Sequence, residues 1–156
     1  MPWRRAGRLS PVWIRSDRRH SFDASPDELW AAMAQVDRYQ EWWPWLRRFD
    51  ATSVSVGDVW TATVQPPLPY RLRFELLITE AQAPSVVAVD VTGDIEGSAR
   101  LEVCRSDVGS ELHFTSELTP ISSVLRAVAQ VASPIVRYGH EWVLDNGLRQ
   151  FRTRAL

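Results

Sequence analysis

Residues 95–118 read IEGSARLEVCRSDVGSELHFTSEL and contain two runs in which apolar and polar side chains alternate. A period of two is typical of a β-strand that buries one face and exposes the other. Between the runs, residues 107–110 include Asp107 and Gly109, and both residue types favour a tight turn. The stretch therefore predicts an antiparallel hairpin with one apolar face and one charged face.

The same alternation continues toward the N-terminus of this hairpin. Prolines and glycine–aspartate pairs divide that part of the chain into short segments. We predict strands at 12–22, 49–55, 59–65, 70–79 and 86–92, with turns at Gly57-Asp58 and Gly93-Asp94. Together with the two runs of the hairpin, these segments predict an antiparallel sheet of about seven strands.

Two short helices are predicted after the first strand. In Ser25-Pro26-Asp27-Glu28, Ser25 can cap a helix, Pro26 suits its first position and Glu28 completes a capping box. We expect this helix to end near Val36. A second short helix, capped by Asp37, is expected to hold Tyr39, Trp42, Trp43, Trp45 and Leu46.

A long helix is predicted over residues 120–154. Apolar residues recur there at steps of three and four, which is typical of a helix with one buried face. The stripe consists of Ile121, Leu125, Val128, Ala132, Ile135, Gly139, Trp142 and Val143. Pro134 removes one backbone hydrogen bond and should kink the helix.

These elements predict an α+β fold in which a curved antiparallel sheet wraps around the long C-terminal helix. Residues 12–156 are expected to form a single domain, and residues 1–11 a flexible basic tail. Such a sheet and helix enclose an apolar face between them. Whether the enclosed space is filled or hollow decides what the protein can do.

Composition excludes several kinds of chemistry. All 18 basic residues among the 156 are arginine, so neither a Schiff-base lysine nor a Walker-type lysine is present. Cys104 is the single cysteine, and the three histidines show no metal-ligand spacing, so we expect no metal and no cofactor. No apolar run approaches the roughly 20 residues of a membrane span, and no secretory signal or RNP-type motif occurs. We expect a cytoplasmic protein that binds no nucleic acid; its oligomeric state is not specified by the sequence.

Several stretches, taken in order, resemble a known family. They are residues 22–30 (FDASPDELW), 42–45 (WWPW), 57–60 (GDVW), 69–74 (PYRLRF), 93–97 (GDIEG) and 139–143 (GHEWV). From about residue 12 to 152 the chain is similar to the polyketide cyclase/dehydrase and lipid-transport family of the SRPBCC (START-like, birch-pollen-allergen-like) superfamily. The resemblance implies a helix-grip fold with a cavity between sheet and long helix, entered near the short helices.

We expect eight residues to line this cavity and contact a ligand. They are Trp43, Trp60, Phe74, Gly97, Ser116, Tyr138, Trp142 and Asn146. Indole rings suit a cavity mouth, and a hydroxyl on an apolar strand face needs a partner. The same residues also fit a filled core, in which the tryptophans form a rigid joint and the small residues allow close packing.

Three functions fit the sequence. We favour binding or transport of a hydrophobic or aromatic small molecule, such as a lipid, isoprenoid or polyketide-like compound. A polyketide aromatase/cyclase is an alternative, but Tyr138, His140, Ser116 and Tyr70 offer no evident proton-transfer pair, so no catalytic residue is assigned. A second alternative is a protein-partner module that uses an exposed apolar mouth.

Overall fold

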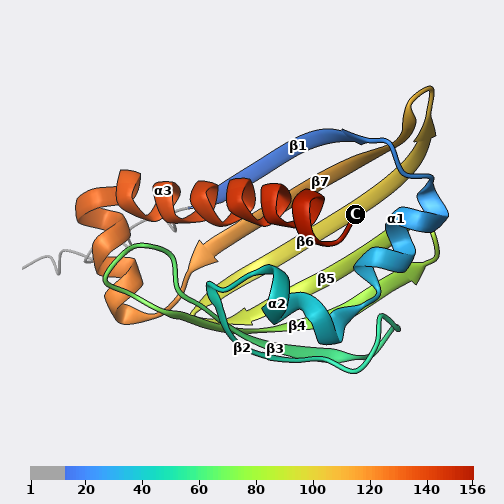
Figure 1. Cartoon of the computed structure of the whole chain (residues 1–156). Helices are drawn as coiled ribbons and strands as arrows, with labels where there is room; N and C mark the ends of the chain where they lie inside the picture. Colours follow the sequence, from blue (N-terminus) through green and yellow to red (C-terminus); the bar gives the residue numbers. More distant parts are fainter. Residues whose placement is uncertain (1–12) are drawn as a thin grey trace, which may run out of the picture.

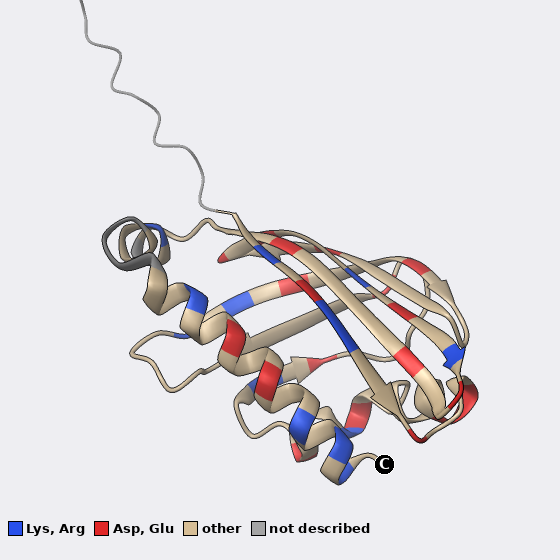
Figure 2. Cartoon of the chain, turned by 90° about the horizontal axis from the view of Figure 1, so that it is seen from above, with Lys and Arg blue, Asp and Glu red and all other residues tan. Residues whose placement is uncertain are grey.

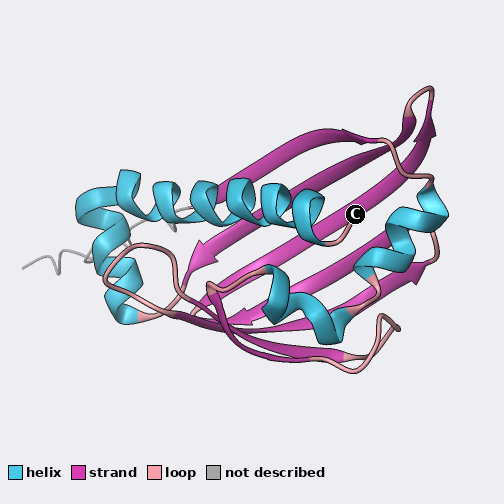
Figure 3. Cartoon of the chain, viewed as in Figure 1, coloured by secondary structure: helices cyan, strands magenta, loops and turns pink. Residues whose placement is uncertain are grey.

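The computed structural model describes residues 13–156, and the side chains of all of these except residues 124 and 130–133. Within this range the chain forms a seven-stranded antiparallel sheet with helices on one face (Figures 1 and 3). The strands are β1 (Ile14–Phe22), β2 (Leu46–Asp50), β3 (Val59–Val64), β4 (Leu72–Gln82), β5 (Val86–Gly93), β6 (Ile95–Ser106) and β7 (Gly109–Pro120). The helices are α1 (Pro26–Met33), a 3₁₀ turn (Val36–Arg38), α2 (Tyr39–Trp42) and α3 (Ser123–Arg154). The predicted helix-grip fold is confirmed, whereas the expected tail lies outside the described residues.

The strand order brings distant parts of the chain together. The order across the sheet is β1-β7-β6-β5-β4-β3-β2, so β1 and β2 lie at opposite edges although they are the first two strands. The connection between them contains α1 and α2, which lie at one end of the sheet (Figure 1). α3 lies across the same face. The apolar face of the sheet is therefore covered by all three helices.

The first helix begins as predicted. The backbone N–H of Glu28 donates to the Ser25 hydroxyl at 3.2 Å, and the Ser25 N–H donates to the Glu28 carboxylate at 3.1 Å. Pro26 takes the first helical position. This reciprocal pair satisfies two backbone N–H groups at once and fixes the direction in which the chain leaves β1.

The second helix is shorter than predicted. Asp37 does not cap it, and α2 ends at Trp42 after a single turn. Pro44 disfavours helical backbone at the preceding residue, and Trp43 has φ −123° and ψ 89°. Leu46, predicted to be helical, instead begins β2.

The β2 strand also differs from the prediction, which placed it at residues 49–55. Residues after Asp50 form a loop that is stabilised by Asp58. The Asp58 carboxylate accepts a hydrogen bond from the Ser55 N–H at 3.1 Å, and the Ser53 carbonyl accepts one from the Trp60 indole at 2.8 Å. These hydrogen bonds take the place of the strand pairing that was predicted for residues 51–55.

The buried stripe of the long helix overlaps the predicted one but is turned relative to it. Ser122 caps α3, and the first turns of the helix run in a different direction from the rest (Figure 1). Pro134 lies within α3. Leu125, Ala129 and Val136 are buried, whereas Ile135 is 43% exposed. Leu125 and Gly139 belong to the predicted stripe, whereas Ala129 and Val136 do not, so the buried face is turned by less than one residue from the predicted one.

The outer face of the sheet is charged, as the alternation predicted. Arg100 forms ion pairs with Glu80 and Glu102 at 2.7 and 2.6 Å. Charged residues recur along the strands and along α3 (Figure 2). No helix among residues 13–156 is long and apolar enough to cross a membrane.

Candidate functional site

A cavity of about 360 Å³ lies between the sheet and α3. Apolar side chains from β3 to β7 form one wall, and α3 forms the opposite wall. The apolar lining includes Trp60, Val64, Leu72, Phe74, Leu76, Val89, Leu101, Phe114, Leu125, Val136 and Val143. At one end Trp30 and Met33 of α1 contribute. The volume falls within the range of ordinary small-molecule sites.

A row of small side chains leaves room beneath α3. Ala99 of β6 pairs with Ser116 of β7, and Ser116 pairs with Ser16 of β1. Since directly paired residues on adjacent strands present their side chains to the same face, these three lie side by side. Ala99 and Ser116 belong to the cavity lining. Bulkier residues in this row would fill the space.

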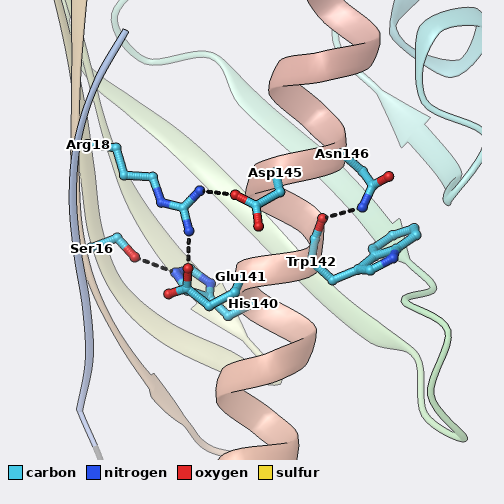
Figure 4. Close-up of polar contacts among 7 residues, drawn as sticks. All are labelled: Ser16, Arg18, His140, Glu141, Trp142, Asp145 and Asn146. Carbon is cyan, nitrogen blue, oxygen red and sulfur yellow. Dashed lines mark hydrogen bonds and ion pairs between the residues drawn. The ribbon is translucent and has the colours of Figure 1, made fainter.

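Three polar side chains of the lining, Tyr70, Ser116 and His140, lie near one turn of α3. His140 shares a hydrogen bond with Ser16, from its Nε2 to the hydroxyl oxygen at 2.8 Å (Figure 4). The Tyr70 hydroxyl lies against Gly139, where a Cβ would be only 2.2 Å from it. Ser116 is 5% exposed, and its hydroxyl has no hydrogen-bond partner among the described residues.

Burial keeps these groups uncharged near neutral pH. It lowers the pKa of His140, and Arg18 and Arg137 lower it further although Glu141 raises it. Burial also raises the pKa of the Tyr70 hydroxyl. The imidazole is therefore neutral and the phenol protonated, so both can exchange hydrogen bonds with a ligand.

Ion pairs hold α3 against the edge strand next to this cluster. The Arg18 guanidinium of β1 contacts the carboxylates of Glu141 and Asp145 (Figure 4). These two residues lie on the side of α3 that faces β1, beside His140. The pairing fixes the turn of the helix that carries the polar end of the cavity.

Three of the eight residues expected from the sequence line the cavity. Trp60, Phe74 and Ser116 do so, each from an inward-facing strand position that the alternation identified. Their contact with a ligand remains a prediction.

The tryptophans expected at the cavity mouth instead join two parts of the fold. The Trp43 indole donates to the Gly147 carbonyl, and the Trp45 indole to the Gln150 side chain, both at 2.9 Å. Their rings are stacked 5.8 Å apart, and Trp142 lies 6.3 Å from Trp45. Trp43 and Trp142 lie outside the cavity lining because they pack the segment after α2 against α3.

The other three expected residues also lie outside the lining. Gly97 has a φ of 147°, and a Cβ there would lie 1.9 Å from the Glu117 carbonyl oxygen, so its small size serves the approach of β7. Tyr138 is 54% exposed on the outer face of α3. The Asn146 amide donates to the Trp142 carbonyl at 2.9 Å, on the side of α3 away from β1 (Figure 4). The turn of α3 relative to the predicted face explains the position of Asn146.

The sequence did not predict Gly139, His140 or Tyr70 as ligand contacts, nor Ser16 as the hydrogen-bond partner of His140. Tyr70 and His140 were considered only as isolated proton-transfer groups. The signal that could have found them is the spacing of Val136, His140 and Val143 on one helical face. Among residues 13–156, no group of three His, Cys, Asp or Glu side chains could hold a metal ion.

Solved structures with this fold cover most of the chain. The di-domain ARO/CYC BexL from the BE-7585A biosynthetic pathway has a TM-score of 0.71 at 13% identity, over 92% of this chain and 50% of that one. A protein of unknown function from Staphylococcus aureus has a TM-score of 0.64 at 13% identity, over 92% and 96% of the two chains. Ara h 8.0201 has a TM-score of 0.56 at 13% identity, over 86% and 99%. At such identities the similarity shows the fold alone.

The sequence itself gives the family. None of the curated proteins matches it. The family model described as polyketide cyclase / dehydrase and lipid transport matches residues 14–156, which is nearly the whole chain. This match shows that the chain belongs to the polyketide cyclase/dehydrase and lipid-transport family.

Proposed function

We propose that this protein binds a hydrophobic or aromatic small molecule, such as a lipid, isoprenoid or polyketide-like compound, between its sheet and α3. The observation that carries the proposal is the cavity of about 360 Å³ with an apolar wall and a few polar groups at one end. Burial of a ligand's apolar surface is favourable by about 25 cal/mol per Å² before the costs of association. The polar groups would fix the orientation of the ligand.

Occupation of the cavity can be tested by filling it. N-phenyl-1-naphthylamine is an uncharged probe whose fluorescence rises in an apolar site. Ala99→Phe places a ring in the lining, whereas Ser98→Phe places the same ring on the exposed outer face of the same strand. We expect the first variant to lose probe binding and the second to retain it, with both folded by circular dichroism.

A second cavity variant, Val89→Phe, guards against a folding defect at position 99, because Val89 pairs with Ala99 and also lines the cavity. Equal probe binding by the Ala99→Phe, Val89→Phe and Ser98→Phe variants would contradict the proposal. So would the absence of binding by the unsubstituted protein.

A cyclase or dehydrase activity is a second candidate, and His140 is the observation that favours it. A neutral imidazole in a cavity wall can accept a proton, and the Tyr70 hydroxyl beside Gly139 can donate one. With a poly-ketone surrogate as substrate, His140→Ala and Tyr70→Phe should each change the product profile. Identical profiles for both variants and the unsubstituted protein would remove this candidate.

A further inference from the structure

The cavity offers a ligand no compensating charge. The polar side chains considered above, Ser116, Tyr70 and His140, are all uncharged near neutral pH. Arg100 is the one arginine, lysine, aspartate or glutamate among the described lining residues. Its guanidinium is held by Glu80 and Glu102 at 2.7 and 2.6 Å on the outer face of the sheet. Its charge is therefore already paired outside the cavity.

The Ser116 hydroxyl is the group most in need of a partner. It is 5% exposed and lacks a hydrogen-bond partner among the described residues, although buried hydroxyls are normally paired. Its strand neighbour Ser16 is already bonded to His140. Because Ser116 belongs to the cavity lining, a ligand oxygen could satisfy this buried hydroxyl once the side chain turns toward the cavity.

Two more groups lie close to that position. Ser16 and Ser116 are directly paired, so the Ser116 side chain lies next to the one that holds His140. The Tyr70 hydroxyl lies against Gly139, the residue that precedes His140. Hydroxyl, phenol and imidazole therefore gather around a single turn of α3.

We propose that this polar end selects an uncharged oxygen of the ligand, a ketone or a hydroxyl group, and rejects a carboxylate on the same skeleton. The proposal rests on the binding function proposed above. A neutral carbonyl or hydroxyl can pair with Ser116 and Tyr70 without a counterion. A buried carboxylate without a cation loses far more hydration than these neutral donors restore.

A matched series of naphthalenes tests this selection at pH 7.5. The competitors 2-acetylnaphthalene, 2-naphthol and 2-naphthoate share one ring system and differ in the oxygen group, and methyl 2-naphthoate removes the charge while adding bulk. Each compound is titrated into the full chain with bound N-phenyl-1-naphthylamine, and the loss of probe fluorescence is measured. We expect the ketone and the alcohol to compete at least about tenfold better than the carboxylate. The ester should recover competition, which separates charge from size.

Ser116→Ala identifies the selecting group, with Ser98→Ala on the exposed outer face as the matched control. We expect Ser116→Ala to weaken binding of the ketone by about two- to tenfold and to leave binding of naphthalene itself unchanged. Equal competition by ketone and carboxylate, or a carboxylate that competes better, would overturn the proposal. So would equal effects of the two serine substitutions. If no probe or competitor binds at all, it is the proposed binding function that fails.

Discussion

Substituting Gly139 tests how α3 and Tyr70 together form the polar end of the cavity. A Cβ at position 139 would lie 2.2 Å from the Tyr70 hydroxyl oxygen and 3.0 Å from Leu68 Cδ1. Non-bonded heavy atoms prefer separations of about 3.5–4.0 Å, so the phenol would have to move by more than about 1 Å. Gly139→Ala therefore combines a helix-propensity gain with a steric conflict.

The two effects have opposite signs. In an unobstructed helix, Gly→Ala raises the free energy of unfolding by about 1 kcal/mol. Overpacking usually costs about 1–3 kcal/mol. We expect Gly139→Ala to lower the free energy of unfolding by roughly 0–2 kcal/mol.

Tyr70→Phe should relieve the conflict, because it removes the oxygen and leaves the ring carbon Cζ at 3.4 Å from the new methyl. We expect Tyr70→Phe alone to change the free energy of unfolding by less than about 1 kcal/mol. The double variant should be more stable than Gly139→Ala by about 1–2 kcal/mol, which is a typical coupling energy for residues in contact.

Urea unfolding followed by tryptophan fluorescence measures all four free energies in this cycle. An additive cycle, with Gly139→Ala more stable than the unsubstituted protein by about 1 kcal/mol, would refute the reasoning. The Tyr70 hydroxyl would then not lie against α3, and the polar end of the cavity would lose one of its groups.

Four further predictions concern stability. Ser116→Ala should leave the free energy of unfolding unchanged or raise it by about 1 kcal/mol, because an unpartnered buried hydroxyl is removed. Ser110→Ala should lower it by about 1 kcal/mol, since that hydroxyl donates to the Ala24 carbonyl at 2.8 Å; urea midpoints that shift alike in the two variants would contradict this contrast. Trp43→Phe should lower the free energy of unfolding by about 1 kcal/mol, because the hydrogen bond to the Gly147 carbonyl is lost. An unchanged melting curve would contradict this contribution. Because burial lowers the pKa of His140, the unfolded chain binds more protons than the folded one as pH falls below about 6.5, and stability is lost there; urea midpoints between about pH 7.5 and 5 should fall less steeply for His140→Asn.

The strands could be predicted from the sequence because apolar and polar residues alternate along each of them. Trp60, Phe74 and Ser116 alternate with exposed neighbours, and that alternation assigned them to the inner face. Strand side chains can point in only two directions, so a correct strand fixes the face. The capping box at Ser25 could be predicted equally well, because it depends on residues only three positions apart.

The helix faces could not be predicted to the same accuracy. In α3 neighbouring residues differ in direction by about 100°, and Tyr138 lies on the outside whereas His140 lines the cavity. Trp43 was misplaced because its partner is the carbonyl of Gly147, more than a hundred positions away. Long-range partners of this kind have no local pattern in the sequence.

The sheet order has a consequence for biosynthesis. Ser16 and His140 meet in the finished fold although they are 124 positions apart, so closing this contact carries a large loop entropy and favours slow folding. At about 5–20 residues per second, the 32 residues of α3 take the ribosome roughly two to six seconds to add. Until α3 is complete, the apolar inner face of the sheet has no long helix over it. A nascent chain halted before Ser123 would expose the apolar face of the sheet that lines the cavity in the complete protein.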